Sequence, residues 1–177
     1  MALTCERFRS NFGIYPVPDI LKELLAFQEI SSQWYSWGFE LSVITSEELQ
    51  DHVPTEVVAQ FLGFGHDGNY SIYALWKYKE MLLDEAPVVY FNSEGEGSGV
   101  QASNLADFFT LLAIDQEPIF GVYSEQAGKD IKHTNRNEEF REWLEQRYHL
   151  HADEHPNDMV QQARHRHPKV PLLYPAG

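Results

Sequence analysis

The chain of 177 residues has one cysteine, few basic residues and no long apolar run. Cys5 by itself cannot form an intrachain disulfide, so no disulfide framework is expected. The first residues show no basic region followed by an apolar run and a small-residue cleavage site, which argues against a secretory signal. The longest apolar runs fall far short of the roughly 18 residues that indicate a membrane span. We therefore expect a cytoplasmic protein in a reducing environment, with no membrane partner.

Basic residues are scarce as well as outnumbered: 13 Lys and Arg stand against 27 Asp and Glu, for a net charge of −14. None occurs between Lys22 and Lys77 or between Lys79 and Lys129. Nucleic-acid binding relies on Lys and Arg to displace counterions from phosphates, so nucleic acid is excluded as a direct ligand. A basic protein partner fits the charge, because complementary fields speed encounter. The alternative is that the charge serves only solubility.

Helices are predicted where apolar residues recur at a spacing of three and four behind a capping residue. The Thr45-Ser-Glu-Glu48 segment matches a capping box, and Ser103 or Asn104 can cap the helix that follows it. Asn137 is the expected cap of the last long helix. The predicted helices cover 19–29, a short segment from 45, 104–112, 138–148 and a short stretch near 158–164.

Strands are predicted at 38–45, 70–78 and 88–91, with a further short strand from Val100, because β-branched and aromatic residues alternate or cluster there. Residues 56–62 remain ambiguous between helix and strand, and the glycines at 63, 65 and 68 predict a turn. The 70–78 segment carries large side chains on both faces, which indicates a central strand of an antiparallel sheet with a helix on one side. The expected architecture is one α+β domain over 1–150, followed by a His- and Pro-rich tail over 151–177.

A glycine-rich acidic loop follows the predicted strand at 88–91. Gly95, Gly97 and Gly99 alternate there with Glu94, Glu96 and Ser98. A phosphate cradle would need a helix start directly after the loop and no competing carboxylates, so nucleotide binding is disfavoured. Two interpretations remain: a tight turn that needs positive φ, or an exposed acidic loop that contacts a partner. We treat Glu94 and Glu96 as candidate partner-binding residues.

The His66-Asp67-Gly68-Asn69 segment reads as a turn, since Asp-Gly is a common turn dipeptide. A calcium loop is not supported, because the regular spacing of oxygen ligands and a downstream bidentate Glu are missing. His66 is expected to face solvent or to lie on the rim of a binding surface. Asp67 joins the two glutamates as a candidate acidic contact.

Three aromatic residues, Trp34, Tyr35 and Trp37, precede the first predicted strand. All three cannot face inward within four residues, so at least one is expected on the surface. Trp and Tyr are frequent anchors of protein interfaces. Trp34 and Trp37 are therefore included as candidate partner-binding residues, with core packing as the alternative for each.

Metal binding and catalysis find little support in the sequence. Five histidines lie at 149, 151, 155, 165 and 167, but without Cys or an H-E-x-x-H pattern they indicate a solvated tail and not a metal site. Cys5 has no base nearby in sequence, and Ser98 lacks the flanking glycines of a nucleophile elbow. We expect no cofactor, no metal and no enzymatic activity.

Several segments together resemble the SUKH superfamily, which includes yeast cell-wall synthesis regulators and bacterial toxin-immunity proteins. They are the Phe64-Gly-His-Asp-Gly68 turn with the strand after it, Val88–Phe91, and the helix start Ala102-Ser-Asn-Leu-Ala-Asp-Phe108, all within 18–113. The resemblance implies an α+β fold with a bent antiparallel sheet, and a cytoplasmic immunity protein that covers a basic toxin domain. The alternative is a regulatory or scaffold module without a toxin partner. The aromatic 33–39 segment and the last 60 residues depart from the pattern, and no catalytic residue is carried over.

Overall fold

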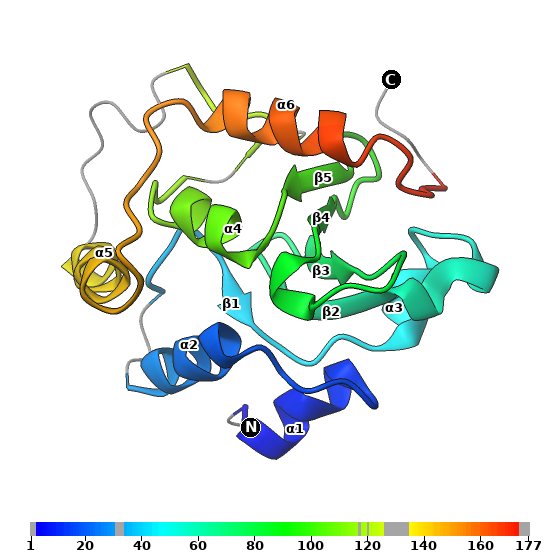
Figure 1. The fold of residues 1–177 in the computed structure, drawn as a ribbon, viewed down its shortest axis with the longest axis horizontal. Coiled ribbons are helices and arrows are strands. Elements are labelled where there is room, and N and C mark those ends of the chain that lie inside the picture. Colours follow the sequence, from blue (N-terminus) through cyan, green and yellow to red (C-terminus); the bar gives the residue numbers. More distant parts are fainter. Residues whose placement is uncertain (1–2, 31–33, 117, 120, 126–134, 174–177) are drawn as a thin grey trace.

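The computed structural model describes the whole chain except residues 1–2, 31–33, 117, 120, 126–134 and 174–177 (Figure 1). Its centre is a five-stranded antiparallel sheet in which the strands neighbour one another in chain order, β1 to β5. The strands are β1 (Glu40–Leu41), β2 (Phe61–His66), β3 (Ile72–Trp76), β4 (Val88–Phe91) and β5 (Gly99–Ala102). This sheet with its helices confirms the α+β class.

The helices surround this sheet (Figure 1). They are α1 (Cys5–Arg9), α2 (Asp19–Glu29), α3 (Ser46–Gln50), α4 (Leu105–Leu112), α5 (Asn135–Tyr148) and α6 (Pro156–Arg166). The described residues also form three short 3-10 turns, Ser10–Phe12, Thr55–Gln60 and Leu83–Glu85. Among the described residues, no helix has the length and apolar character needed to cross a membrane.

β3 is the central strand, as predicted, and its two faces serve two apolar clusters. Tyr73 and Leu75 belong to the larger cluster, which α1, α2, α4 and α5 cover. Ile72, Ala74 and Trp76 belong to the smaller one, closed by α3 and by the segment that follows α6. Helices therefore pack on one side of β3 as expected, and α3 also reaches the other face, because the alternating large side chains of β3 leave both faces to be covered.

Helix starts follow local capping chemistry. α2 begins at Asp19 as predicted, the capping box of Thr45 and Glu48 is formed, and the Asn104 side chain accepts from the Asp107 amide at the start of α4. α5 begins earlier than expected, so Asn137 is not its cap. Asn137 is fully buried inside the helix, and its side-chain amide donates to the Tyr35 carbonyl at 2.9 Å. Asn137 thus makes a tertiary hydrogen bond instead of capping the helix.

α6 packs against β5 and buries Val160 and Ala163. Arg164 donates from Nε to the Val100 carbonyl and from Nη2 to the Gly121 carbonyl, at 3.1 and 3.3 Å. The tail over 151–177 was expected to be solvated, with a short helix near 158–164. For α6 the solvated interpretation is wrong, since one face of the helix is part of the core.

Gly63 and Gly65 lie inside β2 and do not form the predicted turn. Glycine is needed at both positions because neighbouring segments of the chain approach the backbone closely. A Cβ on Gly63 would lie 2.5 Å from Ile44 Cβ, and one on Gly65 would lie 2.7 Å from the Glu40 carbonyl oxygen. Glycine within a strand often marks such contacts, and the register of β2 against β3 shifts between these two residues.

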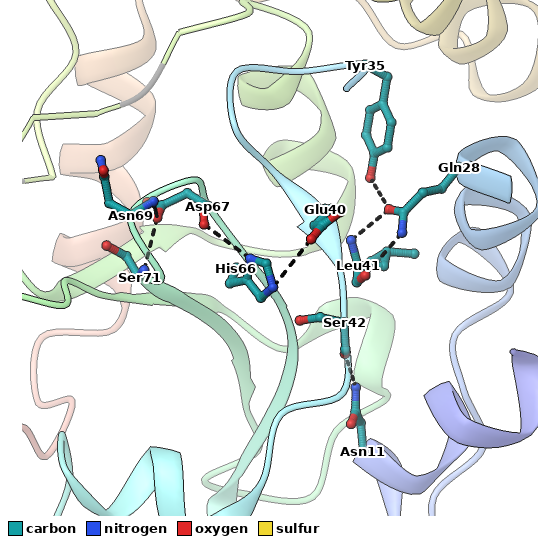
Figure 2. Close-up of polar contacts among 10 residues, drawn as sticks. All are labelled: Asn11, Gln28, Tyr35, Glu40, Leu41, Ser42, His66, Asp67, Asn69 and Ser71. Carbon is teal, nitrogen blue, oxygen red and sulfur yellow. Dashed lines mark hydrogen bonds and ion pairs between the residues drawn. The ribbon is translucent and has the colours of Figure 1, made fainter. Parts of the chain in front are cut away.

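The outer edge of β1 is covered by side-chain amides instead of another strand (Figure 2). Gln28 bonds both backbone polar groups of Leu41. Asn11 donates to the Ser42 carbonyl and accepts from the Ile44 amide. These contacts use backbone groups that an added strand would need, so they protect the edge from strand pairing.

Candidate functional site

An open groove of about 590 Å³ lies between the end of α3 and the loop that joins β4 to β5. The turn between β2 and β3 forms part of its wall. Four carboxylates face it, and the lining residues that the structure describes include no lysine or arginine. The full lining set is Glu48, Asp51, His52, Tyr70, Ile72, Ser93, Glu94, Gly95 and Glu96.

The β4–β5 loop is held in shape by its own hydrogen bonds. The Asn92 side chain donates to the Glu96 carbonyl at 2.7 Å and accepts from the Glu94 amide at 3.0 Å. Ser98 Oγ donates to the Gly95 carbonyl and accepts from the Asn92 amide. Gly95 and Gly97 have φ of 87° and 77°, so the predicted turn with positive φ is confirmed. The loop is therefore a fixed support for its two glutamates.

Glu94 and Glu96 are exposed on this loop, as predicted, and Asp51 is exposed on the opposite wall. None of the three forms an ion pair within the part of the chain that the structure describes. Glu48 differs, because its carboxylate accepts from the Thr45 amide and hydroxyl in the capping box. The groove thus carries negative charge that the described residues leave uncompensated.

His52 does not neutralise the groove at pH 7. Its ring stacks on Phe91, with centroids 5.2 Å apart and planes at 27°. Burial lowers the pKa of His52 below its ordinary value of 6.5, and the nearby Asp51 carboxylate opposes this only in part. The imidazole is therefore neutral at physiological pH and adds a flat surface to the wall.

Tyr70 is the most exposed aromatic side chain at the groove. It has φ of 63°, uncommon for a residue other than glycine, and 78% of the residue is accessible. Its ring centroid lies 5.8 Å from that of His66. The predicted strand from 70 to 78 begins only at Ile72, so Tyr70 belongs to the turn and projects its ring toward solvent.

Asp67 is a structural residue of that turn and not a surface contact (Figure 2). It is 1% exposed, and its Oδ1 accepts from the Asn69 and Ser71 amides, each at 2.9 Å. Tyr90 Oη donates to Oδ2 at 3.4 Å. The expectation that Asp67 is an exposed acidic contact is wrong, because an Asx-type turn directs its carboxylate inward.

His66 is half-buried rather than solvent-facing. Nδ1 lies 3.1 Å from the Asp67 carbonyl oxygen, and Nε2 lies 3.5 Å from Oε1 of Glu40 on β1 (Figure 2). These contacts link the end of β2 to the neighbouring edge strand. His66 is not among the described lining residues of the groove, although its ring lies beside that of Tyr70, so it belongs to the supporting structure around the turn.

Trp34 and Trp37 are exposed, with accessible fractions of 52% and 58%, whereas Tyr35 between them is buried at 1%. This confirms that the three aromatics do not all face inward. The Trp34 ring lies over Gly68, since a Cβ there would be 3.1 Å from Cη2 of the indole. The Trp34 ring therefore lies against the turn that also carries Tyr70, but Trp34 does not line the groove.

A second groove, of about 340 Å³, lies against the same acidic loop. Ser93 and Glu94 line both grooves, which makes the loop a ridge between them. Ile119, an exposed apolar residue, contributes to the second groove together with Asn69 and Pro118. The two grooves and the ridge form one surface at the end of the sheet where the β2–β3 and β4–β5 connections meet.

The residues considered for metal binding or catalysis lie apart from one another or already form hydrogen bonds. Within the described ranges, no group of three or more His, Cys, Asp or Glu side chains is arranged to hold a metal ion. Ser98 is buried and its hydroxyl is occupied within the loop, and Cys5 is exposed on α1. His167, in the histidine-rich tail, lies with Nδ1 3.1 Å from the Tyr78 hydroxyl.

Sequence reasoning missed Tyr70, Asp51 and His52 as groove residues. Tyr70 is placed in a strand by its β propensity, and no local signal marks its positive φ. Asp51 and His52 follow a helix more than 40 positions before the acidic loop, so only packing brings them opposite Glu94 and Glu96. The sequence showed the surplus of acidic residues, but it did not show that some of them face one another across a groove.

A comparison of the chain with protein-family models, curated proteins and solved structures gives no match.

Proposed function

We propose that this chain is a non-catalytic protein-binding domain that engages a basic partner through its acidic groove. The observation that carries the proposal is the pairing of uncompensated carboxylates on two walls, Asp51 on one and Glu94 with Glu96 on the other. Such a surface attracts a basic protein at long range and disfavours acidic ones. The exposed ring of Tyr70 supplies the aromatic contact area that interface hot spots often use.

The resemblance to SUKH proteins supports a more specific role, a cytoplasmic immunity protein whose partner is a basic toxin domain. The alternative is a regulatory or scaffold module of the same fold without a toxin partner. The two differ in the gene's surroundings and in the partner's activity: an immunity protein abolishes the activity of a toxin encoded beside it. A scaffold binds without inhibiting.

The proposal is tested by co-expressing the chain with polypeptides encoded next to its gene and measuring association by calorimetry at several salt concentrations. We expect one of them to bind, with affinity that falls as salt rises because exposed charges are screened. The double substitution Glu94→Lys and Glu96→Lys should weaken that binding at least tenfold.

The matched control is Glu142→Lys with Glu145→Lys, which makes the same change in charge on exposed positions of α5. In Figure 1, α5 lies on the opposite side of the molecule from α3. Equal weakening by both pairs would mean that net charge, and not the groove, drives association. Turnover of ester, phosphate or peptide substrates that disappears on changing one polar residue would replace the binding proposal with an enzymatic one.

A further inference from the structure

We propose that the groove binds an arginine side chain of an extended basic segment, with the guanidinium group held against the Tyr70 ring between carboxylates of the two walls. This deepens the proposed function and rests on it, because it names the chemical group that the partner inserts. The occupant is a cationic side chain carried by a protein.

The first argument is the aromatic wall. Tyr70 is 78% accessible, although the turn that carries it is anchored by the buried Asp67. The ring is therefore displayed from a fixed support instead of being packed into the core. A cation placed over the face of a tyrosine is attracted by the electrons of the ring, and more strongly when it is desolvated.

The second argument is the charge around that ring. Asp51 lines one wall of the groove and Glu94 with Glu96 lines the other, and none of the three forms an ion pair within the described residues. The stacked, neutral His52 contributes no positive charge at pH 7. An inserted cation would therefore meet carboxylates that have no competing intramolecular partner.

The third argument is shape. The groove volume of about 590 Å³ lies within the range of roughly 300–1,000 Å³ that ligand pockets span. That space accommodates a long side chain with part of its backbone. Strand addition is disfavoured as the binding mode at β1, because Gln28 and Asn11 occupy backbone groups at that edge.

Arginine fits this combination better than lysine. Its planar guanidinium can stack on a ring while its fork of donors bonds carboxylates to either side. A lysine ammonium is a compact charge that keeps its hydration more strongly. The groove should therefore discriminate between two side chains of equal charge, which a simple acidic patch would not do.

The test uses three capped pentapeptides, Gly-Gly-Arg-Gly-Gly and its Lys and citrulline counterparts, titrated into the isotopically labelled protein and followed by amide NMR shifts. We expect the arginine peptide to shift Tyr70, Asp51 and Ser93 to Glu96, and to bind at least threefold more tightly than the lysine peptide. Citrulline, which is neutral, should cause no such shifts.

Two variants separate the ring from the charge. Tyr70→Asn removes the ring but keeps a residue that tolerates positive φ, so the turn should remain folded. It should weaken arginine-peptide binding about 2- to 30-fold, the factor that corresponds to loss of a cation–π contact. Ile14→Ala removes an exposed apolar side chain that does not line the groove and should leave binding unchanged.

Equal affinity for the arginine and lysine peptides, shifts that map elsewhere, no shifts at millimolar peptide, or an unaffected Tyr70→Asn variant would each overturn this inference. Its failure is distinguishable from failure of the proposed function. If a cognate partner loses affinity with Glu94→Lys and Glu96→Lys but not with Tyr70→Asn, the binding role stands and the arginine pocket does not. If neither change affects the partner, both fail.

Discussion

The side-chain amide of Gln28 satisfies both backbone polar groups of Leu41. Its Oε1 accepts from the Leu41 amide at 2.7 Å, and its Nε2 donates to the Leu41 carbonyl at 3.1 Å. The Tyr35 hydroxyl donates to the same Oε1 at 3.2 Å. Gln28 of α2 therefore bonds the edge of β1 where a further strand would otherwise pair. It also connects β1 to the buried Tyr35.

Replacing Gln28 with Ala should destabilise the fold by about 1–3 kcal/mol, because partly buried groups of Leu41 and Tyr35 would lose their partner. Urea denaturation measures the change. The control is Glu29→Ala, an exposed change at the end of the same helix that should alter stability by less than about 0.5 kcal/mol. Equal midpoints for the two variants would show that the clamp contributes little.

Asp67→Ala should lower stability, whereas Glu96→Ala should not. Removing the Asp67 carboxylate leaves the buried Ser71 amide without its side-chain acceptor, at a cost of about 1–3 kcal/mol. Glu96 is exposed, so its loss should cost less than about 0.5 kcal/mol. Thermal melts of both variants check the difference, and similar melting temperatures would contradict the structural role of Asp67.

Gly121→Ala tests the packing of α6 against the loops. Gly121 has φ of 73°, and a Cβ there would lie 2.6 Å from both the Gly97 carbonyl oxygen and Arg164 Nη2. Gly13 has a similar φ of 54° but open space around it. Both alanine variants carry a backbone penalty for positive φ, and Gly121→Ala adds the close contacts, so it should melt at the lower temperature. Equal melting temperatures would mean that the loops move aside.

Stability should fall as the pH drops below about 6.5. Burial lowers the pKa of His52, and burial with the neighbouring Lys79 and Arg166 charges lowers that of His167. Between 6.5 and these lowered values the unfolded chain binds protons that the folded chain does not, so acid favours unfolding. The contribution is fully present above pH 6.5 and is lost through that window.

The double variant His52→Asn and His167→Asn should show a shallower loss of melting temperature between pH 7 and pH 5 than the parent protein. His165→Asn, an exposed change near the end of α6, serves as the control. Its pH dependence should follow the parent. A double variant with the parent's slope would show that other groups govern acid stability.

Folding should not depend on metal, as expected from the sequence. Melting curves with and without a chelator should superimpose. A chelator-induced fall of several degrees would indicate a bound ion, because a ligand of the native state stabilises by mass action.

Local patterns were sufficient for much of the architecture. Apolar spacing located α2 and α4, the Thr45 and Asn104 caps fixed helix starts, and the double-faced pattern of 70–78 identified the central strand. These features depend on neighbours within a few residues, where propensity and capping act. The positive φ of the acidic loop follows from its glycines in the same way.

Other features depend on contacts between distant segments. The sequence does not show that Ile44 packs directly against the backbone of Gly63. Nor does it show that the Asn137 side chain bonds the Tyr35 carbonyl, or that the Asp67 carboxylate points into its turn. Each of these outcomes is decided by the segment that packs against the residue and not by the residue's own neighbours.

The sequence by itself determined the α+β class, the surplus of negative charge and the rigid glycine loop that presents Glu94 and Glu96. Only the tertiary structure decided where that charge is concentrated. It does so because folding places Asp51 opposite the loop and holds Tyr70 beside both in a left-handed conformation. Composition sets the total charge of a chain, whereas the shape and chemistry of a groove depend on which distant side chains the core brings together.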